Sequence, residues 1–70
     1  MTKINVDARG LSCPEPVLLT KKALMQAAEE YEILVDNPAA FGNVQRFLKK
    51  AGKLFTAEQR ENDYRIAVKS

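Results

Sequence analysis

The sequence predicts an α/β fold: a two-layer α/β sandwich in which a four-stranded mixed sheet carries two helices on one face. Four segments alternate in polarity, and two segments with helical spacing separate the first three of them. Each alternating segment keeps one polar side, whereas strands of a sheet covered on both faces form continuous apolar runs. We therefore expect the order βαβαββ within one domain spanning residues 1–70.

Residues 3–8 (KINVDA) form the first alternating segment and predict a half-buried strand. Gly10 marks a turn, and we expect a helix over residues 14–29, because prolines are tolerated in the first turn of a helix. The apolar stripe expected on this helix consists of Val17, Thr20, Leu24 and Ala27 or Ala28.

Residues 31–37 (YEILVDN) predict a second strand, after which Asp36, Asn37 and Pro38 provide a cap and a helix-starting proline. The second helix is expected to end at Gly52. Its apolar positions are Ala40, Phe41, Val44, Phe47, Leu48 and Ala51.

Residues 53–59 and 64–70 complete the prediction as two strands joined by a tight turn at Asn62 and Asp63. On the last strand, Tyr64, Ile66 and Val68 share the side expected to face the core. The expected sheet therefore buries one face under the helices and leaves the other open.

Composition and charge exclude several classes of protein. Eleven Lys and Arg against nine Asp and Glu give a net charge of +2, with the signs interspersed, which provides no argument for nucleic acid. No apolar run reaches the length of a signal peptide core or a membrane span, so we expect a cytoplasmic protein without a membrane partner. The chain has no histidine and one cysteine, which excludes a zinc-finger ligand set and an internal disulfide. We expect no metal and no organic cofactor.

Cys13, the only cysteine, lies where the loop after the first strand is expected to enter the first helix. The helix N-terminus can stabilise a thiolate, and Arg9, four residues upstream, can help if the loop folds back. Pro14 and Pro16 stiffen this corner. Glu15 suits the helix dipole but opposes added negative charge on the sulfur. A free cysteine is usually a buried small hydrophobe, yet this position off the apolar stripe favours a chemical role.

The stretch DARGLSCPEPVLLTKKAL resembles the signature of the TusA/SirA/YedF family of small sulfur-carrier proteins, whose hallmark is a Cys-Pro-X-Pro motif opening the first helix. The motif here spans residues 13–16, with Asp7, Gly10 and Leu11 in the family's usual places before it. The stretch VDNPAAFGNVQRFLKKAG is similar to the YedF-like branch, which is associated with selenium metabolism. The family fold is also a two-layer α/β sandwich.

The resemblance implies that Cys13 accepts sulfane sulfur, or selenium, from a cysteine desulfurase or another sulfurtransferase. It would hold the cargo as a persulfide and pass it to an acceptor protein. The chain offers neither a second cysteine nor a visible general base, which suits a sulfurtransferase-like carrier whose catalytic machinery belongs largely to its partners. The residues expected to support the site are Arg9, Gly10, Pro14, Glu15 and Pro16.

Leu18 and Met25 lie on one flank of the first helix, away from the apolar stripe. One hypothesis makes them an apolar patch that docks a partner, and the alternative is a wider core stripe.

A non-enzymatic binding module remains as a second interpretation. The open sheet face would present Lys3, Asn5, Arg65 and Lys69 to RNA or protein. Nucleic-acid-binding sheets usually offer aromatic residues for base stacking, whereas Tyr31 and Tyr64 are expected on the core face, so we do not expect a nucleic acid partner. Thioredoxin-type redox enzymes need a second cysteine and cysteine hydrolases need a histidine, and both residues are absent.

Overall fold

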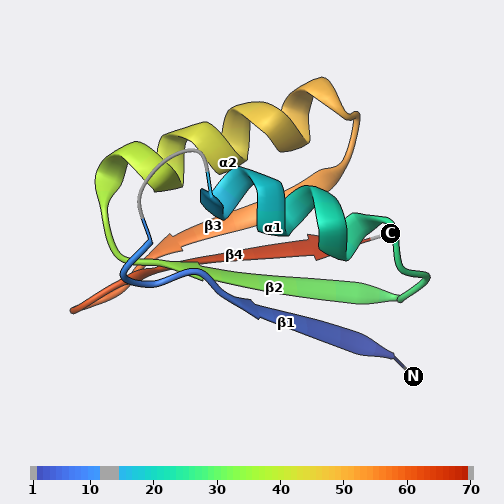
Figure 1. Ribbon diagram of the computed structural model, residues 1–70, viewed down its shortest axis with the longest axis horizontal. Helices are drawn as coiled ribbons and strands as arrows, with labels where there is room; N and C mark the ends of the chain where they lie inside the picture. The colour runs from blue at the N-terminus through green and yellow to red at the C-terminus, as the bar shows by residue number, and fades with distance from the viewer. Residues whose placement is uncertain (1, 12–14, 70) are drawn as a thin grey trace.

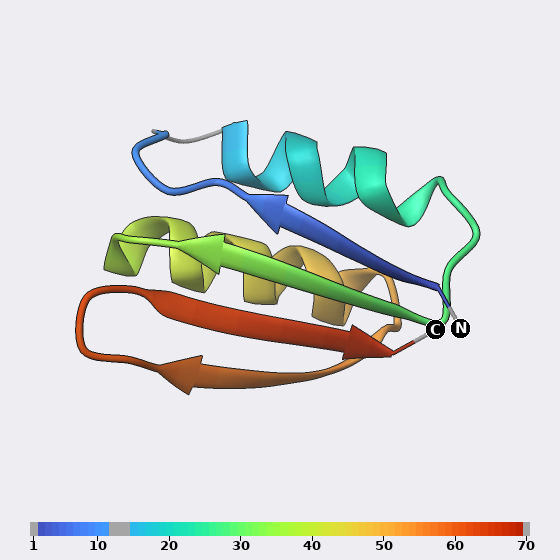
Figure 2. The ribbon, with the colours of Figure 1, turned by 90° about the horizontal axis from the view of Figure 1, so that it is seen from below.

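The computed structural model describes residues 2–11 and 15–69 and has the two layers expected from the sequence (Figure 1). The elements in chain order are β1 (Lys3–Asp7), α1 (Glu15–Leu24), β2 (Glu30–Val35), α2 (Pro38–Lys50), β3 (Leu54–Gln59) and β4 (Tyr64–Lys69). Both helices lie on one side of the sheet, and Figure 2 shows the other side open. The predicted fold class is therefore confirmed. Within the described residues, no helix has the length and apolar character needed to span a membrane.

The four strands are arranged in the order β1-β2-β4-β3. β1 and β2 are parallel, while β4 is antiparallel to both of its neighbours. Consequently the carboxyl ends of β1 and β2 and the start of β4 lie at one end of the sheet, where both helices also begin (Figure 1). The β3–β4 turn lies at this end as well.

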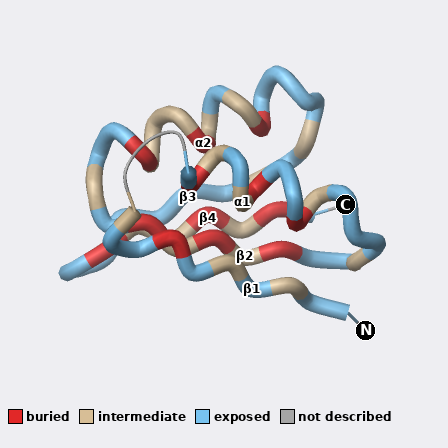
Figure 3. Tube along the Cα trace, viewed as in Figure 1, coloured by how far each residue is buried: buried red, intermediate tan, exposed pale blue. Residues whose placement is uncertain are grey.

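The core lies between the sheet and the two helices and is built mainly from the two central strands and α2 (Figure 3). Ile33 of β2, Ile66 of β4 and Leu48 of α2 have no exposed surface. Along β2 and β4 the buried residues alternate with more exposed ones, so one face of the sheet is buried and the other faces solvent. Tyr31, on the same side, is also buried, as expected from the sequence.

The ends of α2 carry the capping groups that its sequence predicts. The Asn37 side chain accepts a hydrogen bond from the N–H of Ala40 at 2.7 Å, and Pro38 opens the helix. At the other end Gly52 has φ +73°. The N–H groups of Gly52 and Lys53 bond the carbonyls of residues 49 and 48, which is the Schellman arrangement.

α1 is shorter than expected, since it ends at Leu24 and the predicted helix ran to Glu29. The N–H groups of Met25 and Gln26 bond carbonyls three residues back, which tightens and closes the last turn. The hydroxyl of Tyr31 then donates to the Gln26 carbonyl at 2.6 Å and fixes the chain as it turns towards β2. This contact, between residues five positions apart, joins the turn after α1 to β2.

The buried side of α1 consists of Pro16, Thr20 and Ala23. The buried Thr20 hydroxyl has a hydrogen-bond partner, because it donates to the Pro16 carbonyl at 2.8 Å. Leu18 and Met25 are 55% and 80% exposed, so the alternative of a wider core stripe that includes them is wrong.

Replacing Asn37 by Ala removes the side-chain acceptor at the start of α2. We expect the free energy of unfolding to fall by about 1 kcal/mol, because one helix N–H loses its partner. Urea unfolding followed by circular dichroism measures the change. An unchanged midpoint with an unchanged slope would show that the cap contributes nothing.

Candidate functional site

The residues expected at the site fall on both sides of a short gap in the described structure. Cys13 and Pro14 lie outside the described residues. Arg9 and Gly10 follow the carboxyl end of β1, and Glu15 is the first residue of α1. Pro16, in the first turn of α1, is buried against the core, whereas Glu15 is exposed. The structure therefore brings the described support residues to the end of the sheet at which both helices begin.

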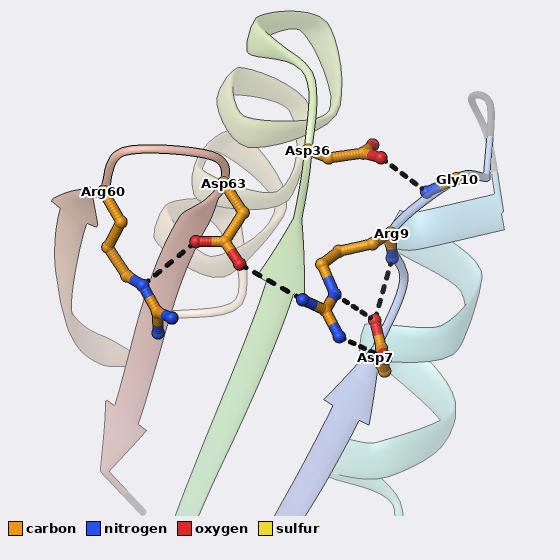
Figure 4. A network of polar contacts seen from close by, with 6 residues as sticks. All are labelled: Asp7, Arg9, Gly10, Asp36, Arg60 and Asp63. Atoms are coloured by element: carbon orange, nitrogen blue, oxygen red, sulfur yellow. Dashed lines mark hydrogen bonds and ion pairs between the residues drawn. The ribbon is translucent and has the colours of Figure 1, made fainter.

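Arg9 follows β1 by two residues and is paired with Asp7, the last residue of that strand (Figure 4). Its Nε and Nη2 groups donate to Oδ1 and Oδ2 of Asp7, both at 2.9 Å, and its backbone N–H donates to Oδ1 at 3.2 Å. A guanidinium and a carboxylate that meet through two parallel bonds have a fixed mutual orientation. The pair therefore turns the chain sharply as it leaves β1.

Asp63 lies in the turn between β3 and β4 and connects the Asp7–Arg9 pair to that turn. Its Oδ2 lies 3.4 Å from Nη1 of Arg9, and its Oδ1 lies 3.0 Å from Nε of Arg60 (Figure 4). The Asp63 side chain is only 6% exposed. A carboxylate this buried needs paired cations, and the two arginines supply them from opposite sides.

Gly10 forms a separate connection to the loop between β2 and α2. Its N–H donates to Oδ2 of Asp36 at 2.9 Å (Figure 4). Gly10 has φ +80°, a conformation that residues with a Cβ rarely adopt. The glycine thus turns its N–H towards a carboxylate 26 positions further along the chain.

The pairing of Arg9 with Asp7 and Asp63 shifts the pKa values of Asp7 and Arg9. Hydrogen bonds from Arg9 lower the pKa of Asp7 from 3.8 to about 2. The same contact, with a smaller contribution from Asp63, raises the pKa of Arg9. Arg9 is therefore permanently charged, but two carboxylates already share its charge.

The open face of the sheet carries a row of alternating charges across all four strands. Nζ of Lys3 and Nε of Arg65 both contact Oε1 of Glu32, at 2.9 and 3.1 Å, and Arg65 also lies 3.4 Å from Glu58. Hydrogen bonds from Lys3 and then from Arg65 lower the pKa of Glu32. Two cations that the binding-module interpretation needs are thus paired within the chain. Tyr64 packs on the other face, stacked on Phe41 with ring centroids 4.4 Å apart.

The sequence did not indicate that Asp36 and Asp63 contact the loop that follows β1. Asp36 was interpreted as part of a helix cap and Asp63 as a turn residue, whereas the cap is made by Asn37 alone. One signal was available for Asp36, because residues that follow two parallel strands meet at the same edge of a sheet. No comparable signal pointed to Asp63, whose role depends on the paths of two separate loops.

The Asp7–Arg9 pair makes part of the stability dependent on acid. Because folding lowers the pKa of Asp7, its contribution is complete above about pH 4 and is lost as the pH falls towards about 2. When the pH falls through this range, we expect the free energy of unfolding, measured with urea, to decrease less for Asp7→Asn than for the wild type. In an Arg9→Gln background the same substitution should leave the acid dependence unchanged, and an equal effect in both backgrounds would contradict the assignment.

Comparison with known proteins adds independent information. The family model described as "Sulfurtransferase TusA" matches residues 4–70. A protein of Methanocaldococcus jannaschii named as "Putative sulfur carrier protein" is 40% identical over 67 residues, which cover 91% of this chain and 89% of that protein. A protein of Archaeoglobus fulgidus with the same designation is 37% identical over 67 residues, covering 91% and 92%.

A solved structure supports the same grouping. The crystal structure of a SirA-like protein from Desulfitobacterium hafniense has a TM-score of 0.84 against this chain, with 30% identity and 96% of each chain covered. The backbone of this chain therefore matches that of a SirA-like protein over nearly its whole length. Together with the family match over residues 4–70, this places the chain in the TusA family, among relatives named as sulfur carriers.

Proposed function

We propose that this protein carries sulfane sulfur as a persulfide on Cys13 and relays it between partner proteins. The observation that supports this most is the start of α1 at Glu15, two residues after Cys13, in a chain of the TusA family. A helix start offers unpaired N–H groups and the positive end of the dipole, both of which favour an anionic sulfur. The place of Cys13 in the chain, two residues before α1, supports the proposal.

The transfer step requires no oxidant and no reductant. The Cys13 thiolate attacks the outer sulfur of a persulfide on the donor, a new S–S bond forms at Cys13, and the donor's S–S bond breaks. The donor cysteine leaves as a thiolate, so the sulfane sulfur and its proton move together and the electron count is unchanged. Delivery to an acceptor thiolate repeats the same exchange from the Cys13 persulfide.

Arg9 enters this proposal as a residue that holds the loop. Its guanidinium is bound to Asp7 and Asp63, which leaves little uncompensated positive charge for the sulfur. We therefore assign Arg9 to holding the loop and assign stabilisation of the anion to the start of α1. Glu15, exposed in the first turn, works against that stabilisation.

Donor and acceptor supply the remaining chemistry in this proposal. A cysteine desulfurase or another sulfurtransferase provides the persulfide, and an acceptor protein removes the sulfur. A single thiol that must remain reduced between transfers suits the cytoplasm. Selenium is the second cargo that the YedF-like resemblance implies.

Intact mass spectrometry tests the proposal after incubation with a cysteine desulfurase, cysteine and the desulfurase's own cofactor. We expect the wild type to gain one sulfur atom that a reductant removes, and the Cys13→Ser variant to gain none. Selenocysteine in place of cysteine tests the selenium cargo. A wild-type protein that stays unmodified while its thiol also resists alkylation would contradict the carrier function.

Leu18 and Met25 suggest where a donor docks. Both side chains are exposed, and Leu18 lies in the first half of α1, close in sequence to the Cys-Pro-X-Pro motif. Burying exposed apolar surface of this kind is a common source of binding free energy. We propose that a sulfur donor covers Leu18 and Met25 when it approaches Cys13.

Replacing Leu18 by Asp should weaken the docking of the donor and leave the fold intact, because Leu18 is 55% exposed. We expect kcat/KM for sulfur transfer to fall by about tenfold, mostly through KM, since a buried anchor contributes more than about 1 kcal/mol. Leu54→Asp is the matched control, because Leu54 is 79% exposed on the far edge strand β3. Equal transfer rates for the two variants would exclude docking at Leu18.

A further inference from the structure

We propose that Asp36 is a positioning residue for the loop that carries Cys13, acting through the hydrogen bond that its Oδ2 accepts from Gly10. This inference rests on the proposed sulfur-carrier function and assigns a role that the family match does not give. Asp36 follows β2 and precedes α2, so it belongs to a different part of the chain from the loop it contacts.

The described part of the loop after β1 makes few hydrogen bonds and ion pairs with the rest of the molecule. The Ala8 N–H bonds the Leu34 carbonyl at 2.8 Å and ends the pairing of β1 with β2. Beyond it, the Leu11 N–H reaches back to Ala8 at 3.4 Å, a contact within the loop itself. For residues 9–11 the structure gives two polar contacts with other elements, Gly10 with Asp36 at 2.9 Å and Arg9 with Asp63 at 3.4 Å. Leu11 adds an apolar contact, because its half-buried side chain packs against the core. The shorter polar contact, and the one that fixes the backbone, is made by Asp36.

The backbone of Gly10 makes this contact specific. With φ +80°, Gly10 turns its N–H out of the direction of β1 and towards the β2–α2 loop (Figure 4). The neighbouring Asn37 is committed to the cap of α2, so the two adjacent side chains have separate tasks. Asp36 fixes the loop and Asn37 fixes the helix.

The contact bears on transfer because Cys13 is three residues after Gly10 in the chain. Attack of a thiolate on a sulfur atom requires the two reacting atoms to be aligned at close range, and a misplacement of about 1 Å is costly. Because Cys13 follows Gly10 by three residues, fixing the Gly10 backbone limits the distance over which the chain can carry Cys13. In this proposal, loss of the Gly10 contact widens that range and slows transfer.

Two substitutions separate the position of the acceptor from its charge. Asp36→Asn keeps an oxygen at the same distance from the backbone and removes the charge. Asp36→Glu keeps the charge and moves the oxygens outward by one methylene. If Asp36 acts by position, the Asn variant resembles the wild type and the Glu variant is impaired. If it acts by charge on the thiol, the order is reversed.

Two rates are measured for each variant: sulfur transfer from a cysteine desulfurase, and alkylation of Cys13 by iodoacetamide as a function of pH. We expect Asp36→Glu to lower kcat/KM for transfer by about three- to tenfold, the equivalent of one hydrogen bond. We expect Asp36→Asn to stay within about twofold of the wild type. The thiol pKa obtained from the alkylation profile should be the same in all three proteins, because in this proposal Asp36 acts through the position of its oxygen and not through its charge.

Asn37→Ala is the matched control. It destabilises the protein at the adjacent residue but leaves the Gly10 contact in place, so its transfer rate should equal that of the wild type. Hydrogen exchange of the Gly10 amide adds a readout that does not depend on Cys13. Protection should persist in the wild type and in Asp36→Asn and should fall in Asp36→Glu.

The outcomes distinguish this inference from the function on which it rests. Equal transfer rates for wild type and Asp36→Glu overturn positioning by Asp36 while the carrier function stands. A lower thiol pKa together with altered transfer in Asp36→Asn overturns it in favour of a charge effect. A slow Asn37→Ala variant overturns it by showing that any loss of stability slows transfer. Absence of sulfur transfer to the wild type overturns the carrier function itself.

Discussion

The parallel pairing of β1 and β2 is the constraint on which the candidate site depends. Because both strands run the same way, the loops that follow them leave the sheet at one end, and α1 and α2 both begin there. β4 runs antiparallel to β2, so its first residue and the turn before it lie at that end too. The loop after β1 is thereby brought within hydrogen-bond distance of two loops that are far from it in sequence.

Two kinds of contact use this proximity. Arg9, clamped to Asp7, extends to the buried carboxylate of Asp63, while the Gly10 N–H meets Asp36. The described part of the loop before Cys13 is thus held from both sides, by groups that belong to the β3–β4 turn and to the β2–α2 loop. Such support from neighbouring groups is what holds a reactive residue in a reproducible position. In this arrangement the Arg9 guanidinium is paired with two carboxylates of its own chain.

Much of the fold could be predicted from the sequence, because apolar spacing reports directly on which face of each element is buried. The end of α1 could not, because apolar residues at helical spacing continue to Ala27 and Ala28, beyond its last residue Leu24. At the site, the motif around Cys13 was visible as a family resemblance. The roles of Asp36 and Asp63 were not, because polar residues in loops carry no periodicity and their partners are decided by how the loops meet.

The most direct test of the account follows the sulfur atom itself. Trypsin cleaves after Arg9 and Lys21, so one peptide contains Cys13 and no other cysteine. After incubation with a cysteine desulfurase and ³⁵S-cysteine, the account predicts that label is recovered on this peptide as an alkylated persulfide and disappears when an acceptor thiol is added before digestion. Label that is absent from this peptide, or that remains on it after the acceptor is added, would contradict a sulfur relay through Cys13.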